Sequence, residues 1–461
     1  MDWYRIGARQ YGVQFSEHCI SCCTPKYKAI IPAPFYRQIF LPSDKNEVLY
    51  IEKNDWDRFS GALRQKYQGN PQNYADLEQQ FMEYTKVYVA SAKKIHNTDL
   101  SGLNSVEIKK LFMENYELET RYIAYDWVLW ELNNIFANNA KETIHSRFGI
   151  GSPKTYSFYD ALLNPANKTS IHQMRELAPK WNKLNEQEKL SVYRDFLWVP
   201  CIDIHMKEWS REDFSRHMSN LKNDGKYKMP YEEAVEALKL NDEERILVDI
   251  AKKLTYIKDF KDDSKRRCIY LEKNIYREIA KRMGITLEES SYLRWSEIIK
   301  FLDTGKKVPT RLIRDRMEGF VSYYNENRVL VCGVGAEIKK VIRKFEIKAY
   351  EKALPRIRGT IASQGFAKGT AVIIRTIEDL QKVKEGDVLI TFMTHPDYVP
   401  AMQKASAIVT DEGGITCHAA IVSREFGLPC IVGAESATQT FKDGDVVEVN
   451  ANEGYVTKID S

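Results

Sequence analysis

The residues best suited to chemistry lie near the C-terminus, in the stretch TDEGGITCHAAIVSREFGLPCIVG, residues 410–433. A glycine pair, Gly413 and Gly414, comes shortly before His418, which opens a run of helical character. An imidazole is a nucleophile at neutral pH, because its reference pKa of about 6.5 leaves most of it uncharged. A histidine of this kind can take up a phosphoryl group and pass it on.

The neighbours of His418 favour a phosphate as the group that binds there. The first turn of a helix presents unpaired N–H groups and the positive end of the helix dipole, which together attract anions. Glycines let the backbone come close, a threonine adds a hydroxyl donor, and an arginine offers a fork of donors. We therefore predict His418 as the catalytic residue and, as phosphate-positioning residues, Gly413, Gly414, Thr416 and Arg424. On the residues alone, a helix-capping or packing role for the histidine stays open.

A β-turn-α-β unit is predicted to position these residues. The segment SAIVT, residues 406–410, is apolar and β-branched, which is typical of a buried strand, and DEGG supplies a turn. A helix is expected from about Cys417 through HAAIVSREF. Gly427 suits the end of that helix and Pro429 prevents its continuation, before PCIVG forms the next strand.

The character of the sequence changes near Pro355, which predicts two domains. Helical periodicity dominates residues 1–350, where we expect a mainly α-helical body with only KAIIPAP and EVLYIEK, between residues 28 and 53, as strands. Residues 356–461 alternate glycine-containing turns with short β-branched runs, which predicts a small α/β domain. The charged segment between them, with its single proline, is typical of a helix end that passes into a semi-rigid linker.

Composition excludes several classes of protein. The 461 residues carry 68 basic and 64 acidic side chains, a net charge of +4 that does not favour nucleic acid or an anionic membrane as partner. No apolar run reaches the roughly 18–20 residues of a membrane span, and the N-terminus lacks the pattern of a signal peptide. We expect a cytoplasmic protein with reduced cysteines. HCISCC, residues 18–23, has no second ligand pair for zinc, so no metal site is predicted.

Four other features of the sequence can contribute to a site. His395, in MTHPDY, can assist phosphate binding, although the sequence favours a turn. Cys417 lies at a helix start, where the pKa of a thiol falls. KDDSKRR, residues 261–267, can clamp an anionic acceptor, but a charge run favours a solvated helix face. YDWVLWEL, residues 125–132, can line a pocket, but aromatic residues at helical spacing favour a core.

The stretch GGITCHAAIVSREFGLPCIVG closely resembles the phosphohistidine motif of the swivelling domain in phosphoenolpyruvate synthases, pyruvate phosphate dikinases and rifampicin phosphotransferases. GTIASQGFAKGTAVII and GDVLITFMTHPDYVPAMQKASAIVTDEGG are similar to the opening and the middle of that domain. The resemblance implies that His418 is the phosphorylated residue and that residues 356–461 move between an ATP-grasp site and an acceptor site. More weakly, residues 193–218 and 247–303 resemble the helical domain of rifampicin phosphotransferases, which implies an acceptor-binding role for the body.

The sequence departs from those relatives where ATP should bind. It holds no glycine-rich phosphate loop followed by acidic metal ligands, and no pyruvate-binding barrel is recognisable. We therefore expect ATP and Mg²⁺ to bind a separate ATP-grasp protein and no cofactor to bind this chain, which relays phosphate through His418 to a small-molecule acceptor. This makes it a dikinase-like phosphotransferase that is incomplete without its partner. The alternative is a non-catalytic binding or regulatory module that keeps the swivelling domain as a scaffold, and a phosphoenolpyruvate donor is a third hypothesis.

Overall fold

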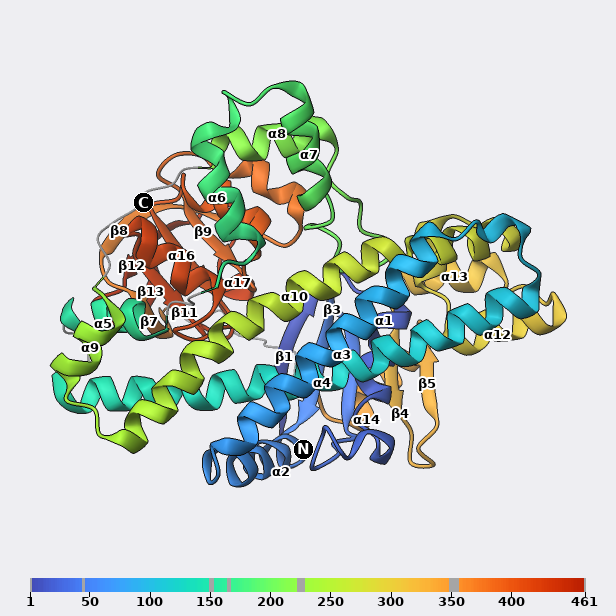
Figure 1. Ribbon diagram of the computed structural model, residues 1–461, viewed down its shortest axis with the longest axis horizontal. Coiled ribbons are helices and arrows are strands. Elements are labelled where there is room, and N and C mark those ends of the chain that lie inside the picture. The colour runs from blue at the N-terminus through green and yellow to red at the C-terminus, as the bar shows by residue number, and fades with distance from the viewer. Residues whose placement is uncertain are drawn as a thin grey trace. The chain divides into compact units, whose positions relative to one another are not determined.

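The computed structural model describes residues 2–43, 46–148, 153–163, 167–221, 229–347 and 356–459 (Figure 1). Contacts divide the chain into two compact units. Unit 1 comprises residues 1–131, 197–209 and 260–348, and unit 2 comprises residues 132–196, 210–259 and 349–461. The predicted boundary between residues 350 and 356, with the linker at Pro355, lies outside the described residues, so the predicted domain division stays a prediction.

Unit 1 contains an antiparallel sheet of five strands in the order β1-β3-β2-β4-β5. Its strands are β1 (Trp3–Arg9), β2 (Gln38–Ser43), β3 (Asn46–Glu52), β4 (Val321–Tyr324) and β5 (Leu330–Gly333). The prediction of a strand in EVLYIEK is confirmed by β3. The prediction for KAIIPAP is wrong, because residues 28–34 form turns and bends. Pro32 and Pro34 lack the N–H groups that a ladder needs, and proline is confined to strand edges for that reason.

Helices form the rest of unit 1. They are α1 (Val13–Ser21), α2 (Lys53–Leu63), α3 (Gln72–Asn97), α11 (Leu287–Ser291), α12 (Trp295–Thr304), α13 (Thr310–Glu318) and α14 (Ala336–Lys344). Two longer helices, α4 (Ser105–Phe148) and α10 (Asp242–Met283), begin in one unit and end in the other. Capping contacts begin two of these helices: Glu107 accepts from the N–H of Asn104 at 2.8 Å, and Glu289 accepts from that of Thr286 at 2.8 Å.

Unit 2 contains an eight-stranded sheet in the order β6-β13-β12-β8-β9-β10-β11-β7. Its strands are β6 (Arg356–Arg358), β7 (Thr360–Ser363), β8 (Phe366–Ile374), β9 (Val388–Thr391), β10 (Ala407–Thr410), β11 (Cys430–Val432), β12 (Val446–Asn450) and β13 (Tyr455–Lys458). The four strands β8-β9-β10-β11 are parallel, which requires crossovers and buries both faces of each strand. Residues 356–459, called the α/β domain below, thus have the predicted small α/β fold.

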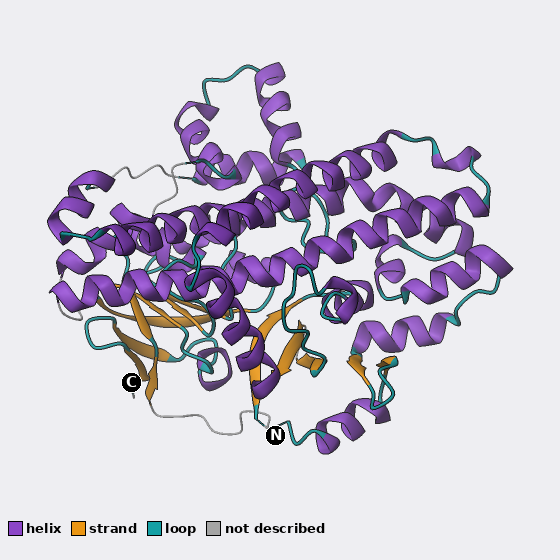
Figure 2. Ribbon diagram, turned by 60° about the horizontal axis from the view of Figure 1, so that its bottom comes forward, coloured by secondary structure: helices purple, strands orange, loops and turns teal. Residues whose placement is uncertain are grey.

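The remaining helices of unit 2 belong to two groups. In the α/β domain they are α15 (Val399–Met402), α16 (His418–Phe426) and α17 (Ala437–Thr440). Those of the N-terminal body are α5 (Pro153–Leu163), α6 (Ser170–Trp181), α7 (Glu186–Phe196), α8 (Arg211–Asn220) and α9 (Tyr231–Leu238). Figure 2 shows the strands gathered into sheets and helices making up most of the chain. The predicted fold class, a mainly helical body followed by a small α/β domain, is confirmed.

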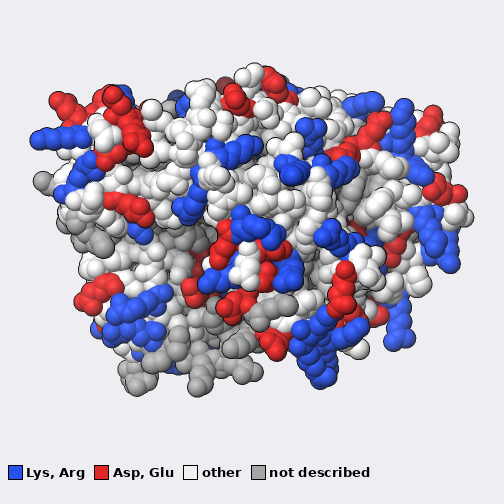
Figure 3. Space-filling model, turned by 90° about the horizontal axis from the view of Figure 1, so that it is seen from below, with Lys and Arg blue, Asp and Glu red and all other residues white. Residues whose placement is uncertain are grey.

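Surface charge and hydropathy agree with the even composition. On the face drawn in Figure 3, Lys and Arg side chains are interspersed with Asp and Glu. Within the described part of the chain, no helix is both long enough and apolar enough to cross a membrane.

Candidate functional site

The predicted β-turn-α-β unit is present and places His418 at the first position of α16. Strands β10 and β11 lie side by side and parallel, with Ile408 opposite Cys430. The helix ends at Gly427, whose φ of 67° is left-handed as the prediction required. At the other end Cys417 is the N-cap, and its Sγ accepts the N–H of Ala420 at 3.4 Å.

The two glycines before this helix have different environments. Gly413 has a φ of 113°, and a Cβ built there would lie 2.8 Å from Sγ of Cys417. That position therefore requires glycine for the turn itself. A Cβ at Gly414 would meet no atom within 4 Å, so space remains beside it for a bound group. The phosphate-positioning role of both residues stays a prediction.

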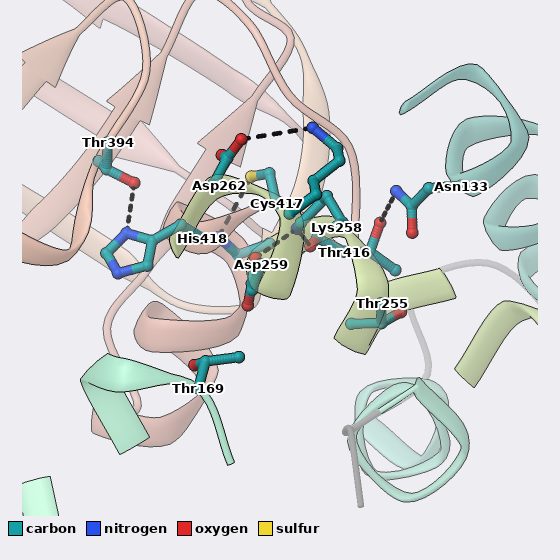
Figure 4. A network of polar contacts seen from close by, with 12 residues as sticks. Asn133, Thr169, Thr255, Lys258, Asp259, Asp262, Thr394, Thr416, Cys417 and His418 are labelled. Carbon is teal, nitrogen blue, oxygen red and sulfur yellow. Dashed lines mark hydrogen bonds and ion pairs between the residues drawn. The ribbon is translucent and has the colours of Figure 1, made fainter. Parts of the chain in front are cut away.

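The imidazole of His418 is held by a threonine from another loop. Nδ1 of His418 lies 2.9 Å from Oγ1 of Thr394, a buried residue that follows β9 (Figure 4). When Nδ1–H donates to this hydroxyl, the lone pair resides on Nε2, which becomes the nucleophilic nitrogen. Thr394 was not among the predicted site residues, although it lies in one of the stretches that resemble the swivelling domain.

Thr416 is bound by two residues of the helical body that belong to the same unit. Its Oγ1 accepts from Nδ2 of Asn133, on α4, at 3.1 Å, and its carbonyl accepts from Nζ of Lys258, on α10 (Figure 4). Because the hydroxyl is the acceptor in the first of these bonds, its own hydrogen can still be donated. Lys258 also lies 3.5 Å from Asp259. Local sequence patterns gave no signal for Asn133 or Lys258, since both are distant in the chain.

Two nitrogens of the Arg424 guanidinium, Nε and Nη1, are bound by protein groups. Its Nε donates to Oδ1 of Asp160, on α5, at 2.6 Å, and its Nη1 donates to the carbonyls of Ala362 and Ile415 at 3.2 and 2.9 Å. The guanidinium is therefore part of a buried network rather than an open anion site. Its predicted contact with phosphate stays a prediction.

The pKa of Cys417 differs from the expectation. Burial raises the pKa of this thiol, and the N–H of Ala420 and the charge of Lys258 offset that effect only in part. The predicted lowering at a helix start is therefore wrong here, because desolvation of the thiolate outweighs the helix terminus. His395 forms the predicted turn, in which its carbonyl accepts from the N–H of Tyr398 at 2.9 Å.

The charge run at residues 261–267 lies in unit 1, as does the aromatic run at residues 125–132 except for its last residue. The aromatic run at residues 125–132 is largely buried, so its interpretation as core is confirmed. The charge run KDDSKRR is not a solvated face: Lys261 and Lys265 are buried. Both lysines bind the carboxylate of Asp126, on α4, and Lys265 does so at 2.8 Å. That interpretation was wrong because the partner carboxylate lies far away in sequence.

Comparison with known proteins agrees with the local geometry. Residues 383–454 match the family model described as PEP-utilising enzyme, mobile domain. The chain is 38% identical over 197 residues to the probable phosphoenolpyruvate synthase of Methanothermobacter thermautotrophicus, covering 40% of this chain and 28% of that protein. It is 51% identical over 189 residues to the phosphoenolpyruvate synthase of Pyrococcus furiosus, covering 39% of this chain and 22% of that protein. Residues 383–454 of this chain are thus similar to the mobile domain of PEP-utilising enzymes.

These matches cover only a small part of each relative. The chain spans less than a third of the length of either relative, since the shares are 28% and 22%. Among solved structures, Thermococcus kodakaraensis aconitase X in its holo-form matches 23% of this chain and 100% of that chain at 18% identity, with a TM-score of 0.20. A TM-score of this size carries no argument about fold or function.

Proposed function

We propose that this chain is the phosphohistidine-carrying part of a dikinase-like phosphotransferase, in which His418 relays a phosphoryl group to a small-molecule acceptor. The observation that carries the proposal is the hydrogen bond between Nδ1 of His418 and Oγ1 of Thr394, at the first turn of α16 and inside the mobile-domain match. A histidine that only capped or packed would not need one ring nitrogen fixed beside the open end of a helix.

The first step is attack of Nε2 of His418 on the phosphorus of the donor. The N–P bond forms while the P–O bond to the nucleotide breaks, and the nucleotide leaves with the bonding electron pair. Nδ1 keeps its proton and donates a hydrogen bond to the hydroxyl of Thr394. This hydrogen bond stabilises the positive charge on the phosphorylated ring. The N–H groups of the first turn of α16 face the equatorial oxygens and offset their charge.

The second step reverses the first on another molecule. A hydroxyl, amine or carboxylate of the acceptor attacks the same phosphorus, the N–P bond breaks, and its electron pair returns to Nε2 of His418. Lys258 supports phosphate transfer at His418. Its ammonium group donates to the carbonyl of Thr416 and so places a positive charge near the start of α16. Thr416 keeps a hydrogen to donate to a phosphoryl oxygen.

The donor side of the relay belongs to the proposal as well. We assign ATP and Mg²⁺ to the ATP-grasp site of a separate protein, where magnesium neutralises charge on the phosphates, and no cofactor to this chain. Residues 1–461 hold no glycine-rich phosphate loop with acidic metal ligands, so the proposal assigns the donor site to residues outside this sequence.

One observation favours the alternative, a non-catalytic binding or regulatory module. Arg424, predicted to contact phosphate, is instead held by Asp160 and two backbone carbonyls. In a module that had lost the reaction, such pairing would persist as scaffold and His418→Ala would leave the biological role intact. The two functions therefore make opposite predictions for a single substitution.

Mass spectrometry of the intact chain separates the two functions. The chain is incubated with extract of its own cells, Mg²⁺ and ATP, and kept alkaline because a phosphoramidate is acid-labile. We expect one added phosphoryl group on the wild type and none on His418→Ala. Thr394→Val should be labelled about tenfold more slowly, because the tautomer is no longer selected. No phosphate on the wild type, in an extract active on a known relative, would contradict the relay.

A further inference from the structure

The C-terminal end of α16 carries two adjacent residues of opposite charge, and each is paired with the helical body. Arg424 donates to Asp160, on α5, at 2.6 Å. Glu425 forms an ion pair with Arg175, on α6. All four residues belong to unit 2, and Arg424, Glu425 and Arg175 keep at most 11% of their side chains exposed. The last turn of α16 is therefore bound to the helical body by two ion pairs of opposite orientation.

The signs of these charges specify one way of docking. A positive and then a negative residue on α16 meet a negative and then a positive residue on α5 and α6, so a shifted arrangement would bring like charges together. The next residue, Phe426, adds a cation–π contact, because the guanidinium of Arg175 lies 5.3 Å from its ring centroid. Three consecutive residues are thus recognised together.

The same contact is poorly suited to be permanent. Within the described residues, Nε and Nη2 of Arg175 are buried and have no hydrogen-bond partner. A buried donor without a partner costs free energy, and a buried ion pair repays its desolvation only with complete hydrogen bonding. The pairing therefore combines high specificity with low net stability, which suits a reversible contact.

Both ends of the α16 segment are held by the helical body. Asn133 and Lys258 bind Thr416 just before the helix, and Asp160 and Arg175 bind its last turn. We propose that Asp160 and Arg175 form a docking latch, whose occupant is the α16 end of the α/β domain and whose opening releases His418 toward its phosphate donor. The docking contact itself does not depend on the proposed function, whereas the role of its opening in phosphate transfer does.

Hydrogen exchange on the full chain tests the latch without any phosphate chemistry. Asp160→Asn and Arg175→Gln should each raise exchange in residues 418–426 about tenfold, because a short helix owes its protection to tertiary contacts. Exchange in strands β8 to β11 should stay at the wild-type rate. The charge-swapped pair Arg175→Glu with Glu425→Arg should restore much of the protection, which also shows that the variants fold.

A matched control comes from an exposed pair in the same domain. Lys368 lies 3.1 Å from Glu448 with 53% of its side chain exposed, and Lys368→Gln should leave exchange in residues 418–426 unchanged. Wild-type exchange in both latch variants would overturn the proposal. Equal loss of protection throughout β8 to β11 would also overturn it, because the contact would then be part of one permanent fold.

A second measurement distinguishes failure of the latch from failure of the relay. In the extract assay, Arg175→Gln should accept phosphate on His418 about threefold to tenfold faster than the wild type, since the undocked state is more populated. An unchanged or slower rate, with His418 still labelled, would contradict the latch while the relay stood. The exchange experiment needs no phosphate and tests the latch even if the relay is refuted.

Discussion

Two groups of buried charge in this molecule are built in different ways. In unit 1, Lys261 and Lys265 share the carboxylate of Asp126 and both approach Asp262, so each lysine has two carboxylate partners. In unit 2, Arg175 pairs with one carboxylate and leaves two nitrogens buried without a partner among the described residues. A group whose bonds are complete stabilises one arrangement, whereas an incomplete one lets an arrangement be exchanged.

The largest expected effect comes from breaking the complete group. Asp126→Ala leaves Lys261 and Lys265 buried beside a single carboxylate, which should lower the free energy of unfolding of unit 1 by about 3–5 kcal/mol. Urea unfolding followed by tryptophan fluorescence measures this, because every tryptophan except Trp181 lies in unit 1. A loss below about 1 kcal/mol would show that water already reaches the lysines.

Lowering the pH should destabilise unit 2, which contains Arg175, before it destabilises unit 1, which contains Asp126. Burial, reinforced by Arg175, lowers the pKa of His217, on α8, from 6.5 to about 4. The unfolded chain therefore binds the extra proton between pH 6.5 and 4, and unit 2 should lose on the order of 3 kcal/mol across that window. Burial opposes ionisation of Asp126, but the two lysines hold its pKa below the usual 3.8, so its contribution is lost only at lower pH.

Hydrogen exchange at pH 7 and pH 5 checks this order. Protection in residues 170–181 and 211–220 should fall, while protection around Asp126 in α4 should not. The variant His217→Gln should flatten the response of unit 2. Equal loss in both units would contradict the assignment of the pH response to His217.

A third change concerns a buried carboxyl group of unit 1 that has no cationic partner among the causes of its pKa shift. Burial, and then the carboxylate of Glu119, raise the pKa of Glu272 well above its usual value. The folded state then holds this proton to a higher pH than the unfolded state, which costs stability above the usual pKa of 4.5 that returns as the pH falls toward it. Glu272→Gln should raise the free energy of unfolding at pH 7 by about 1–2 kcal/mol and remove that pH dependence. A destabilised variant would show that the carboxyl group makes a hydrogen bond that the amide cannot replace.

The smallest effect should come from a pair in neither group. Lys368→Gln removes an exposed partner of Glu448 and should change the stability of unit 2 by about 0–1 kcal/mol, with any effect screened by salt. Thermal unfolding at low and at high salt measures it. An effect as large as that of Asp126→Ala would mean that burial does not distinguish the pairs of this protein.

Local chemistry in the sequence was enough to predict the helix that begins at His418. Gly427 and Pro429 mark its end, and the β-branched run at residues 406–410 marks the strand before it, since each signal acts through neighbouring residues. The same reasoning failed for β4, because this four-residue strand joins the sheet by pairing with β2, which lies nearly 300 residues earlier.

The partners of the site were beyond such reasoning for a related cause. Thr416 is bound by Asn133 and Lys258, which are 283 and 158 residues away, and Arg424 is bound by Asp160, 264 residues away. A single sequence carries no local mark of such pairings. The burial of Lys261 and Lys265 was missed in the same way, since a charge run looks solvated until its carboxylate is known.

The contact between Gly413 and Cys417 has a consequence for how this sequence can evolve. Any side chain at position 413 must adopt a left-handed backbone and would also meet the sulfur of Cys417 at 2.8 Å. A smaller residue at 417 relieves the collision but not the backbone strain, so no single mutational step leads away from glycine without loss. Gly414 meets no protein atom in this way, so a side chain at position 414 would compete only with the group that is proposed to bind beside it.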